Sequence, residues 1–256
     1  MASTLQVDGA ITGSSTINGV GINVIETGSI LISNDGGTGT ISSAVRNTGF
    51  GFEVFDDLTT GDDNTSMGRK ALTKLTTGGG NTAVGSGSLT AHTTGDSNTA
   101  FGVSSLAANT TASNNTAVGS SALGANTTGA LNAALGSEAL LANTTGDQNV
   151  AMGYEALQAN TTADGNVALG TRTLQANTTG ASNTAVGHQT LYANTTASNN
   201  TAVGMNALVA NTTGTRNTAI GAYAADAITD GLANVLVGNN AGGGGNIDPY
   251  LCIHVN

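Results

Sequence analysis

A 17-residue unit repeats along most of this 256-residue chain, and no other feature of the sequence restricts its fold as strongly. An asparagine recurs at the same place in every unit from Asn47 to Asn234, and a glycine follows four residues after each one, from Gly51 to Gly238. We number the positions of the unit 1 to 17 from this asparagine, and the units, or coils, 1 to 12 from the N-terminus. Because both columns are complete, we predict a solenoid in which each coil stacks on the next.

The consensus of the unit is N-T-A-V-G-x-x-A-L-x-A-N-T-T-G-x-x. Positions 1 to 4 are predicted to form a short strand, and the glycine at position 5 suits a corner that needs a positive φ or has no room for a Cβ atom. Position 4 is always large and apolar, so we expect its side chain to point inward and stack on its copies. This column consists of Phe50, Met67, Val84, Phe101, Val118, Leu135, Met152, Leu169, Val186, Val203, Ile220 and Val237.

Positions 6 to 11 carry mixed signals. Segments such as Tyr154–Ala159 contain good helix formers, which favours a single helical turn, while a second short strand competes with it. Six residues are too few for periodicity to separate the two. The Asn-Thr-Thr-Gly segment predicts a turn, and stacked asparagine side chains of successive coils are expected to hydrogen-bond to one another.

The predicted core is small. Position 4 and position 9, which is leucine in nine consecutive coils from Leu72 to Leu208, supply only two large apolar residues per coil. Coils that pair as parallel strands rise by about 4.8 Å each, so twelve coils give a rod of roughly 55–60 Å. So thin a rod is expected to pack against copies of itself about a common axis, most simply as a homotrimer.

The repeat divides the chain into three parts. Residues 1–46 lie outside the register and are predicted to be a separate β region, plausible as an attachment end; residues 47–250 form the solenoid, and residues 251–256 a C-terminal strand. The expected N-terminal strands are Leu5–Val7, Ala10–Ile11, Ile22–Ile25 and Ile30–Ile32. The last coil departs from the pattern at Gly242–Gly245, as terminal repeats that cap a solenoid often do.

Charge and composition exclude several classes of function. Only 9% of the residues are charged and the net charge is −10, which argues against a nucleic-acid-binding surface. The N-terminal sequence lacks the basic and apolar regions of a secretory signal, and no apolar stretch is long enough for a membrane helix. We therefore expect neither export nor membrane insertion.

The sequence offers no convincing catalytic, cofactor or metal site. His92, His188 and His254 lie far apart, and Cys252 is alone. Paired carboxylates could serve polysaccharide cleavage, and four aspartates share position 16, but a turn aspartate more often makes local hydrogen bonds. These are Asp62, Asp96, Asp147 and Asp164.

Positions 6 and 7 vary freely, which indicates the outer face of the coil. A few exposed rings there or nearby could pack on sugars of a receptor. The candidate receptor contacts are Tyr154, His188, Tyr192 and Tyr223.

The unit N-T-A-x-G-x-x-A-L-x-A-N-T-T-G resembles the repeats of bacteriophage tail fibres and related tail appendages over residues 47–250. It is more distantly similar to the head repeats of trimeric autotransporter adhesins, and the opening segment Leu5–Gly13 resembles the start of many phage fibre proteins. Autotransporter adhesins need an export signal and a membrane anchor, which we do not find in this sequence. The likeness to phage fibres therefore implies a virion protein that assembles in the host cytoplasm.

The expected function is that of a structural virion component, a tail fibre or appendage shaft involved in host attachment. Its expected partners are its own copies, other tail or baseplate proteins bound through residues 1–46, and a host glycan or protein receptor. A bacterial cell-surface adhesin head is the alternative, and a polysaccharide-degrading tail enzyme is the third candidate.

Overall fold

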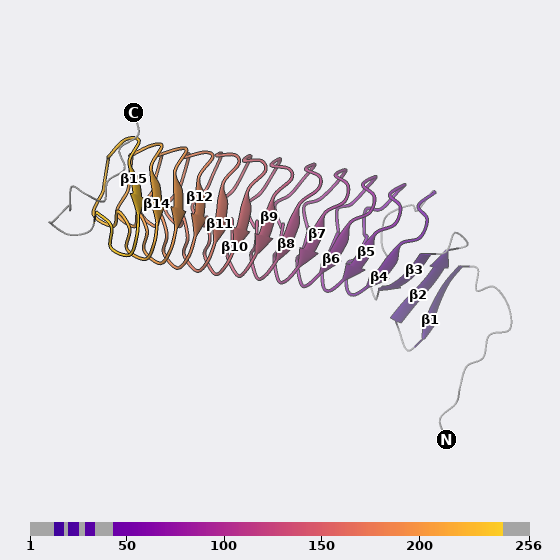
Figure 1. The fold of residues 1–256 in the computed structure, drawn as a ribbon. Coiled ribbons are helices and arrows are strands. Elements are labelled where there is room, and N and C mark those ends of the chain that lie inside the picture. Colours follow the sequence, from indigo (N-terminus) through magenta and orange to yellow (C-terminus); the bar gives the residue numbers. More distant parts are fainter. Residues whose placement is uncertain (1–12, 18–19, 26–28, 34–42, 243–256) are drawn as a thin grey trace, which may run out of the picture.

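The computed structural model describes residues 13–17, 20–25, 29–33 and 43–242, and it confirms an all-β solenoid. Fifteen strands form one sheet whose strand order follows the sequence (Figure 1). The first three strands are β1 (Gly13–Ile17), β2 (Val20–Ile25) and β3 (Ser29–Ser33), which pair antiparallel. Strand β3 then pairs parallel with β4, so the sheet continues from this region into the repeat.

The twelve strands of the repeat are three residues long and occupy positions 2 to 4 of successive coils. Each pairs in parallel and in register with the equivalent strand of the next coil, for example Val150 with Val167. They are β4 (Thr48–Phe50), β5 (Thr65–Met67), β6 (Thr82–Val84), β7 (Thr99–Phe101), β8 (Thr116–Val118), β9 (Ala133–Leu135), β10 (Val150–Met152), β11 (Val167–Leu169), β12 (Thr184–Val186), β13 (Thr201–Val203), β14 (Thr218–Ile220) and β15 (Val235–Val237).

In the N-terminal region, the expected strands Ile22–Ile25 and Ile30–Ile32 fall within β2 and β3 and are confirmed. The expected strands Leu5–Val7 and Ala10–Ile11, and the C-terminal strand 251–256, lie outside the described residues.

Positions 6 to 11 form neither of the two elements considered from the sequence. Within the described residues there is no helix, and this segment consists of consecutive turns. Two residues in it take left-handed backbone conformations, as Glu155 (φ 56°) and Leu157 (φ 52°) do in coil 7. Alternating these with right-handed residues bends the chain around the coil, and neither a helix nor a strand tolerates such an alternation.

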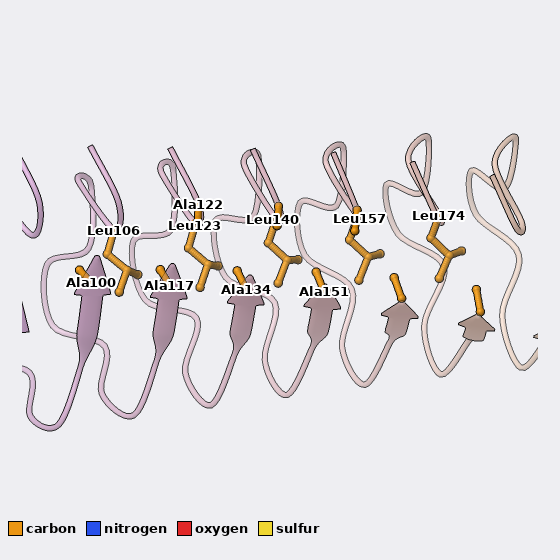
Figure 2. Packing of buried hydrophobic residues seen from close by; sticks show 14 of the residues in the cluster. Ala100, Leu106, Ala117, Ala122, Leu123, Ala134, Leu140, Ala151, Leu157 and Leu174 are labelled. Atoms are coloured by element: carbon orange, nitrogen blue, oxygen red, sulfur yellow. The ribbon is translucent and has the colours of Figure 1, made fainter. Parts of the chain in front are cut away.

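The expectation that position 4 points inward is wrong. The alanine at position 3 faces the interior and the residue at position 4 faces solvent: Ala100 is fully buried in β7, whereas Phe101 beside it is 56% exposed. Side chains of a strand alternate between its two faces, so the buried asparagine at position 1 and alanine at position 3 force positions 2 and 4 outward. Figure 2 shows the small core, in which alanines such as Ala134 meet leucines such as Leu140 across each coil.

The glycine column at position 5 does have the positive φ that the sequence predicts, between 130° and 145° in every coil. A second restriction comes from the neighbouring coil. A Cβ atom placed on Gly136 would lie 2.5 Å from the carbonyl oxygen of Gly153, far inside van der Waals contact. Both the backbone conformation and the spacing of the coils therefore require glycine here.

Two asparagine ladders run through the interior and confirm the predicted stacking. At position 1, the Oδ1 of Asn132 accepts hydrogen bonds from the backbone N–H and the side-chain Nδ2 of Asn149, at 2.9 and 3.2 Å. At position 12, Nδ2 of Asn143 donates to Oδ1 of Asn126 at 2.8 Å and to the carbonyl of Gly146 at 3.0 Å. The buried amides are thus satisfied by the coil before them and by their own turn.

Backbone hydrogen bonds connect neighbouring coils around the whole circumference, not only along the strands. Between coils 5 and 6 they include Thr116 N–H to Asn132 O (2.8 Å) and Leu123 N–H to Ala139 O (3.0 Å). The position-13 threonine adds a side-chain bond, since Thr127 Oγ1 donates to Thr144 O at 3.0 Å. Each coil is therefore fixed to the next on all sides.

The terminal coils keep the core volume while exchanging its residues. Coil 1 combines Gly49 at position 3 with Phe55 at position 9, and coil 12 combines Leu236 with Gly242. A Cβ atom on Gly242 would collide with Cδ2 of Leu236, so the leucine fills the space that the position-9 side chain occupies elsewhere. The two positions share one volume, and either can supply the large residue.

Candidate functional site

All four aromatic residues proposed as receptor contacts lie on the outer surface of the rod. Tyr154 and His188 occupy position 6 of coils 7 and 9, Tyr192 occupies position 10 of coil 9, and Tyr223 occupies position 7 of coil 11. Tyr154, Tyr192 and Tyr223 are 45%, 36% and 39% exposed, and His188 is also exposed. None of them contributes to the core.

Arg172 in coil 8 joins two of these tyrosines into one cluster. Its guanidinium carbon lies 5.9 Å from the centre of the Tyr154 ring, within the range of a cation–π interaction. Tyr192 follows Gln175 by one repeat at position 10, and Gln175 donates to Glu155, the partner of Arg172. The structure therefore brings Tyr154 and Tyr192 to one patch on coils 7 to 9, while Tyr223 lies two coils beyond.

Glu155 fixes the position of Arg172. The Nε of Arg172 donates to Oε2 of Glu155 at 2.8 Å, and the Tyr154 hydroxyl also bonds to this carboxylate. The hydrogen bond from Tyr154, followed by that from Arg172, lowers the pKa of Glu155 below its usual value. The hydrogen bond to Glu155 raises the pKa of the Tyr154 hydroxyl, which remains a neutral donor.

A row of amides and carboxylates extends the cluster along the rod. Nε2 of Gln158 donates to Glu138 Oε2 at 2.6 Å, and Nε2 of Gln175 donates to Glu155 Oε2 at 2.7 Å and to Gln158 Oε1 at 3.1 Å. We call Glu138, Tyr154, Glu155, Gln158, Arg172, Gln175 and Tyr192 the polar patch. It combines two exposed aromatic rings with several hydrogen-bond donors and acceptors, and sugar-binding sites use both kinds of group.

The residues predicted from the sequence include the two tyrosines of this patch but not Glu155 and Arg172, the ion pair that holds Tyr154 in place. The signal was available: Glu155 and Arg172 are one repeat apart, so they occupy the same position of neighbouring coils. The same relation produces the ion pair of Glu53 with Lys70 at 3.0 Å. Opposite charges one repeat apart in a solenoid predict an ion pair between coils.

The position-16 aspartates make hydrogen bonds, but not the local ones expected from the sequence, because each carboxylate accepts from a backbone N–H seventeen residues earlier. Oδ1 of Asp96 accepts from the backbone N–H of Gly79 at 2.8 Å, and Oδ1 of Asp164 accepts from that of Asp147 at 2.7 Å. Asp147 accepts in the same way from Ala130 of the coil before it, and Asp62 accepts from Val45, just before the repeat. Serine does the same at this position, since Ser113 Oγ accepts from Asp96 N–H at 2.9 Å. The column thus caps backbone donors between coils.

The outward position-4 column forms a second surface feature. We call it the outer stripe, and it consists of the twelve position-4 residues from Phe50 to Val237. Eight of them are large hydrophobic residues with substantial exposure, among them Phe50, Phe101 and Met152 at 55%, 56% and 47%. The strands β4 to β15 pair in parallel and lie side by side along the rod (Figure 1). Since each of the twelve residues ends one of these strands, the stripe runs along the whole repeat.

The described part of the chain carries neither a cluster of metal ligands nor a membrane-spanning helix. Residues 43–242 and the three N-terminal strands contain no group of three or more His, Cys, Asp or Glu side chains that could hold a metal ion. The same residues include no helix with the length and hydropathy needed to cross a membrane.

No protein-family model, curated protein or solved structure matches this chain.

Proposed function

We propose that this chain forms the shaft of a bacteriophage tail fibre or a similar virion appendage and takes part in host attachment. The observation that carries the proposal is the uninterrupted hydrogen bonding between coils, which involves strands, turns and two internal asparagine ladders. A shaft has to transmit position and load between its ends, and a rod fixed around its whole circumference suits that task. The resemblance of the repeat to tail-fibre repeats supports the same assignment.

Binding accounts for the surface better than catalysis does. A glycosidase needs one carboxyl group whose pKa is raised so that it can donate a proton. The pKa of Glu155 is lowered instead, and its carboxylate is held by Tyr154, Arg172 and Gln175. The position-16 aspartates bond to the backbone. We therefore propose a non-catalytic protein whose proposed receptor is a host surface glycan or protein.

Labelling of virions tests the location. An antibody raised against residues 43–242, coupled to gold, is expected to decorate tail appendages of the phage that encodes this chain when virions are viewed by electron microscopy. Gold on the surface of uninfected cells instead would favour the adhesin head. Release of reducing ends from host polysaccharide by the purified rod would favour the degrading enzyme.

Adsorption tests the four candidate receptor contacts, of which Tyr154 and Tyr192 belong to the polar patch. A variant with alanine at Tyr154, His188, Tyr192 and Tyr223 is expected to fold, because all four side chains are exposed, and to bind host cells at least tenfold more weakly. Normal adsorption by the folded variant would show that the shaft is a spacer and that another protein or segment recognises the host.

A matched control removes four other exposed side chains. We choose exposed threonines at position 14 of coils that do not carry the polar patch, and their removal is expected to leave adsorption unchanged. They are Thr60, Thr77, Thr94 and Thr213.

A further inference from the structure

The outer stripe is larger than the apolar patches that single-chain proteins usually leave open. Its twelve side chains, many of them about half exposed, present roughly 800–1,000 Å² of apolar surface, compared with about 300–600 Å² for the largest patch on a typical monomer. A stable interface buries about 800 Å² on each partner. A stripe that is buried entirely against other chains therefore provides the area of a stable interface.

The placement of charge identifies a suitable partner. Between residues 47 and 242, every acidic residue lies at positions 7 to 17 of its coil, and positions 1 to 5 carry no charged residue in any coil. The only lysine, arginine, aspartate or glutamate at position 6 is Arg69. A chain with a net charge of −10 repels its copies over most of its surface, but it can meet them along the stripe without bringing carboxylates together.

The pitch of the rod also fits a second copy. The stripe repeats once per coil, and only another rod with the same spacing of about 4.8 Å keeps its side chains in step over twelve coils. The small core is a further reason to expect packing against another copy. Position 4 is absent from the interior, and each coil encloses little more than two alanines, one leucine and two asparagines.

We propose that the outer stripe is the surface through which copies of this chain pack side by side, with their N-terminal ends together, to form the shaft. The common direction rests on the proposed function, in which residues 1–46 attach every copy at the same end. Coil n of one copy then faces coil n of the next, and a closed ring of copies buries every stripe about one axis. Three copies about the axis, the number expected from the sequence, complete this arrangement.

The mass of the assembly in solution gives the first test. Light scattering of the wild-type chain at micromolar concentration is expected to give three times the 24.9 kDa chain mass. The double variant Phe101→Asp, Met152→Asp puts charges into coils 4 and 7 of the stripe, and its mass is expected to fall to that of a single chain. A single-chain mass for the wild type, or an unchanged mass for the double variant, would overturn the proposal.

The control variant Thr111→Asp, Thr162→Asp adds the same charges to the same two coils at exposed position 14. It is expected to keep the wild-type mass. Loss of association in this control would mean that added charge anywhere dissociates the rod, and would contradict a role specific to the stripe.

Disulfide cross-linking tests whether equivalent coils of neighbouring copies face each other, even if the aspartate variant does not fold. In a Cys252→Ser background, Val118→Cys places one thiol in the stripe at coil 5, and parallel copies bring these thiols together to form an intermolecular disulfide on mild oxidation. Antiparallel copies would place coil 5 opposite coil 8, so Val118→Cys would stay unlinked. The control Thr128→Cys, at position 14 of the same coil, is expected to remain unlinked.

These outcomes are separable from those of the proposed function. A monomeric rod whose antibody decorates phage tails would overturn the stripe interface alone. An associated rod found on cell surfaces would overturn the virion assignment alone.

Discussion

The inner and outer faces of each repeat strand differ in how strictly the type of residue is restricted. Position 3, on the inner face, is alanine in nine of the twelve coils, and its replacements are matched by changes at position 9 in coils 1 and 12. Position 4, on the outer face, ranges in size from valine to phenylalanine without any such matching. The interior thus matches volume at coils 1 and 12, although coil 11 has alanine at both positions (Ala219 and Ala225), whereas the outer stripe is specified only by being apolar. A surface of that kind is selected for what it meets outside the coil.

The largest expected effect comes from replacing the glycine at position 5, the corner that ends each repeat strand. Gly136→Val combines a φ of 137°, which costs a β-branched residue about 1–3 kcal/mol, with a collision between the new Cβ and the backbone of coil 7. We expect a loss of more than about 3 kcal/mol in the free energy of unfolding, and separate unfolding of the two halves of the rod. Urea denaturation followed by circular dichroism measures both.

The matched control is Ser137→Val, one residue further on. Position 6 already holds valine at Val103, so this change should leave the urea midpoint nearly unchanged. Equal stability of the Gly136→Val variant and the control would show that the corner tolerates a side chain.

A second prediction compares the inner and outer faces of β9 directly. Ala134→Leu adds volume to a filled interior and is expected to cost about 1–3 kcal/mol, whereas Leu135→Ala, on the outer face at 42% exposure, should cost a single chain under about 1 kcal/mol. If Leu135→Ala were the more damaging change, position 4 would belong to the core after all.

The shared volume of positions 3 and 9 predicts a rescue. The double variant Ala134→Leu, Leu140→Gly reproduces the arrangement of Leu236 and Gly242, and Leu140 already has a φ of 53° that glycine accepts. We expect the double variant to be more stable than the sum of the single changes by about 1–2 kcal/mol, measured as a double-mutant cycle in urea. If the free-energy changes of the two single variants simply add, positions 3 and 9 do not share one volume.

Much of this architecture follows from the repeat alone, and the errors have identifiable causes. The constant repeat length fixes the solenoid, the glycine corner and the asparagine ladders, because each column stacks on itself. The direction of position 4 was predicted wrongly because a large apolar residue was assumed to be buried, although large apolar residues also occur on surfaces. Strand alternation already placed Asn149 and Ala151 on one face and Met152 on the other. Residue propensities do not predict the left-handed backbone conformation of Leu157, because the tight coil imposes it on a residue that rarely adopts it.

The end of the position-12 ladder gives a smaller prediction. Oδ1 of Asn211 is buried and accepts no hydrogen bond from the residues that the structure describes, because coil 11 has Ile228 at position 12. Ile228→Asn supplies a donor, whereas Ile228→Ala removes the same apolar surface without one. The asparagine variant should be more stable than the alanine variant by about 1 kcal/mol, the net contribution of a typical hydrogen bond. Equal urea midpoints would mean that this oxygen already has a partner.

The smallest expected effect lies at the other end of this ladder, where His92 takes the place of asparagine. Nδ1 of His92 lies 3.0 Å from Nδ2 of Asn109 and accepts from it, and Nε2–H donates to the Gly95 carbonyl at 2.8 Å. The neutral ring thus reproduces the acceptor and the donor of an asparagine amide. Protonation would turn Nδ1 into a second donor facing the Asn109 amide.

Burial lowers the pKa of His92 below its ordinary value of 6.5, against weaker opposing contributions from the Gly95 carbonyl, Asn109 and the Asp96 carboxylate. The unfolded chain therefore binds a proton at a higher pH than the folded one, so the contribution of the neutral ring is complete above about pH 6.5 and is lost as the pH falls below it. His92→Asn should extend the ladder and abolish that part of the pH dependence, while His188→Asn, an exposed control, should not. Urea midpoints of the three proteins between pH 7.5 and pH 5 measure the difference. A wild-type midpoint that falls no more than that of His92→Asn would show that the ring is not held neutral by the ladder.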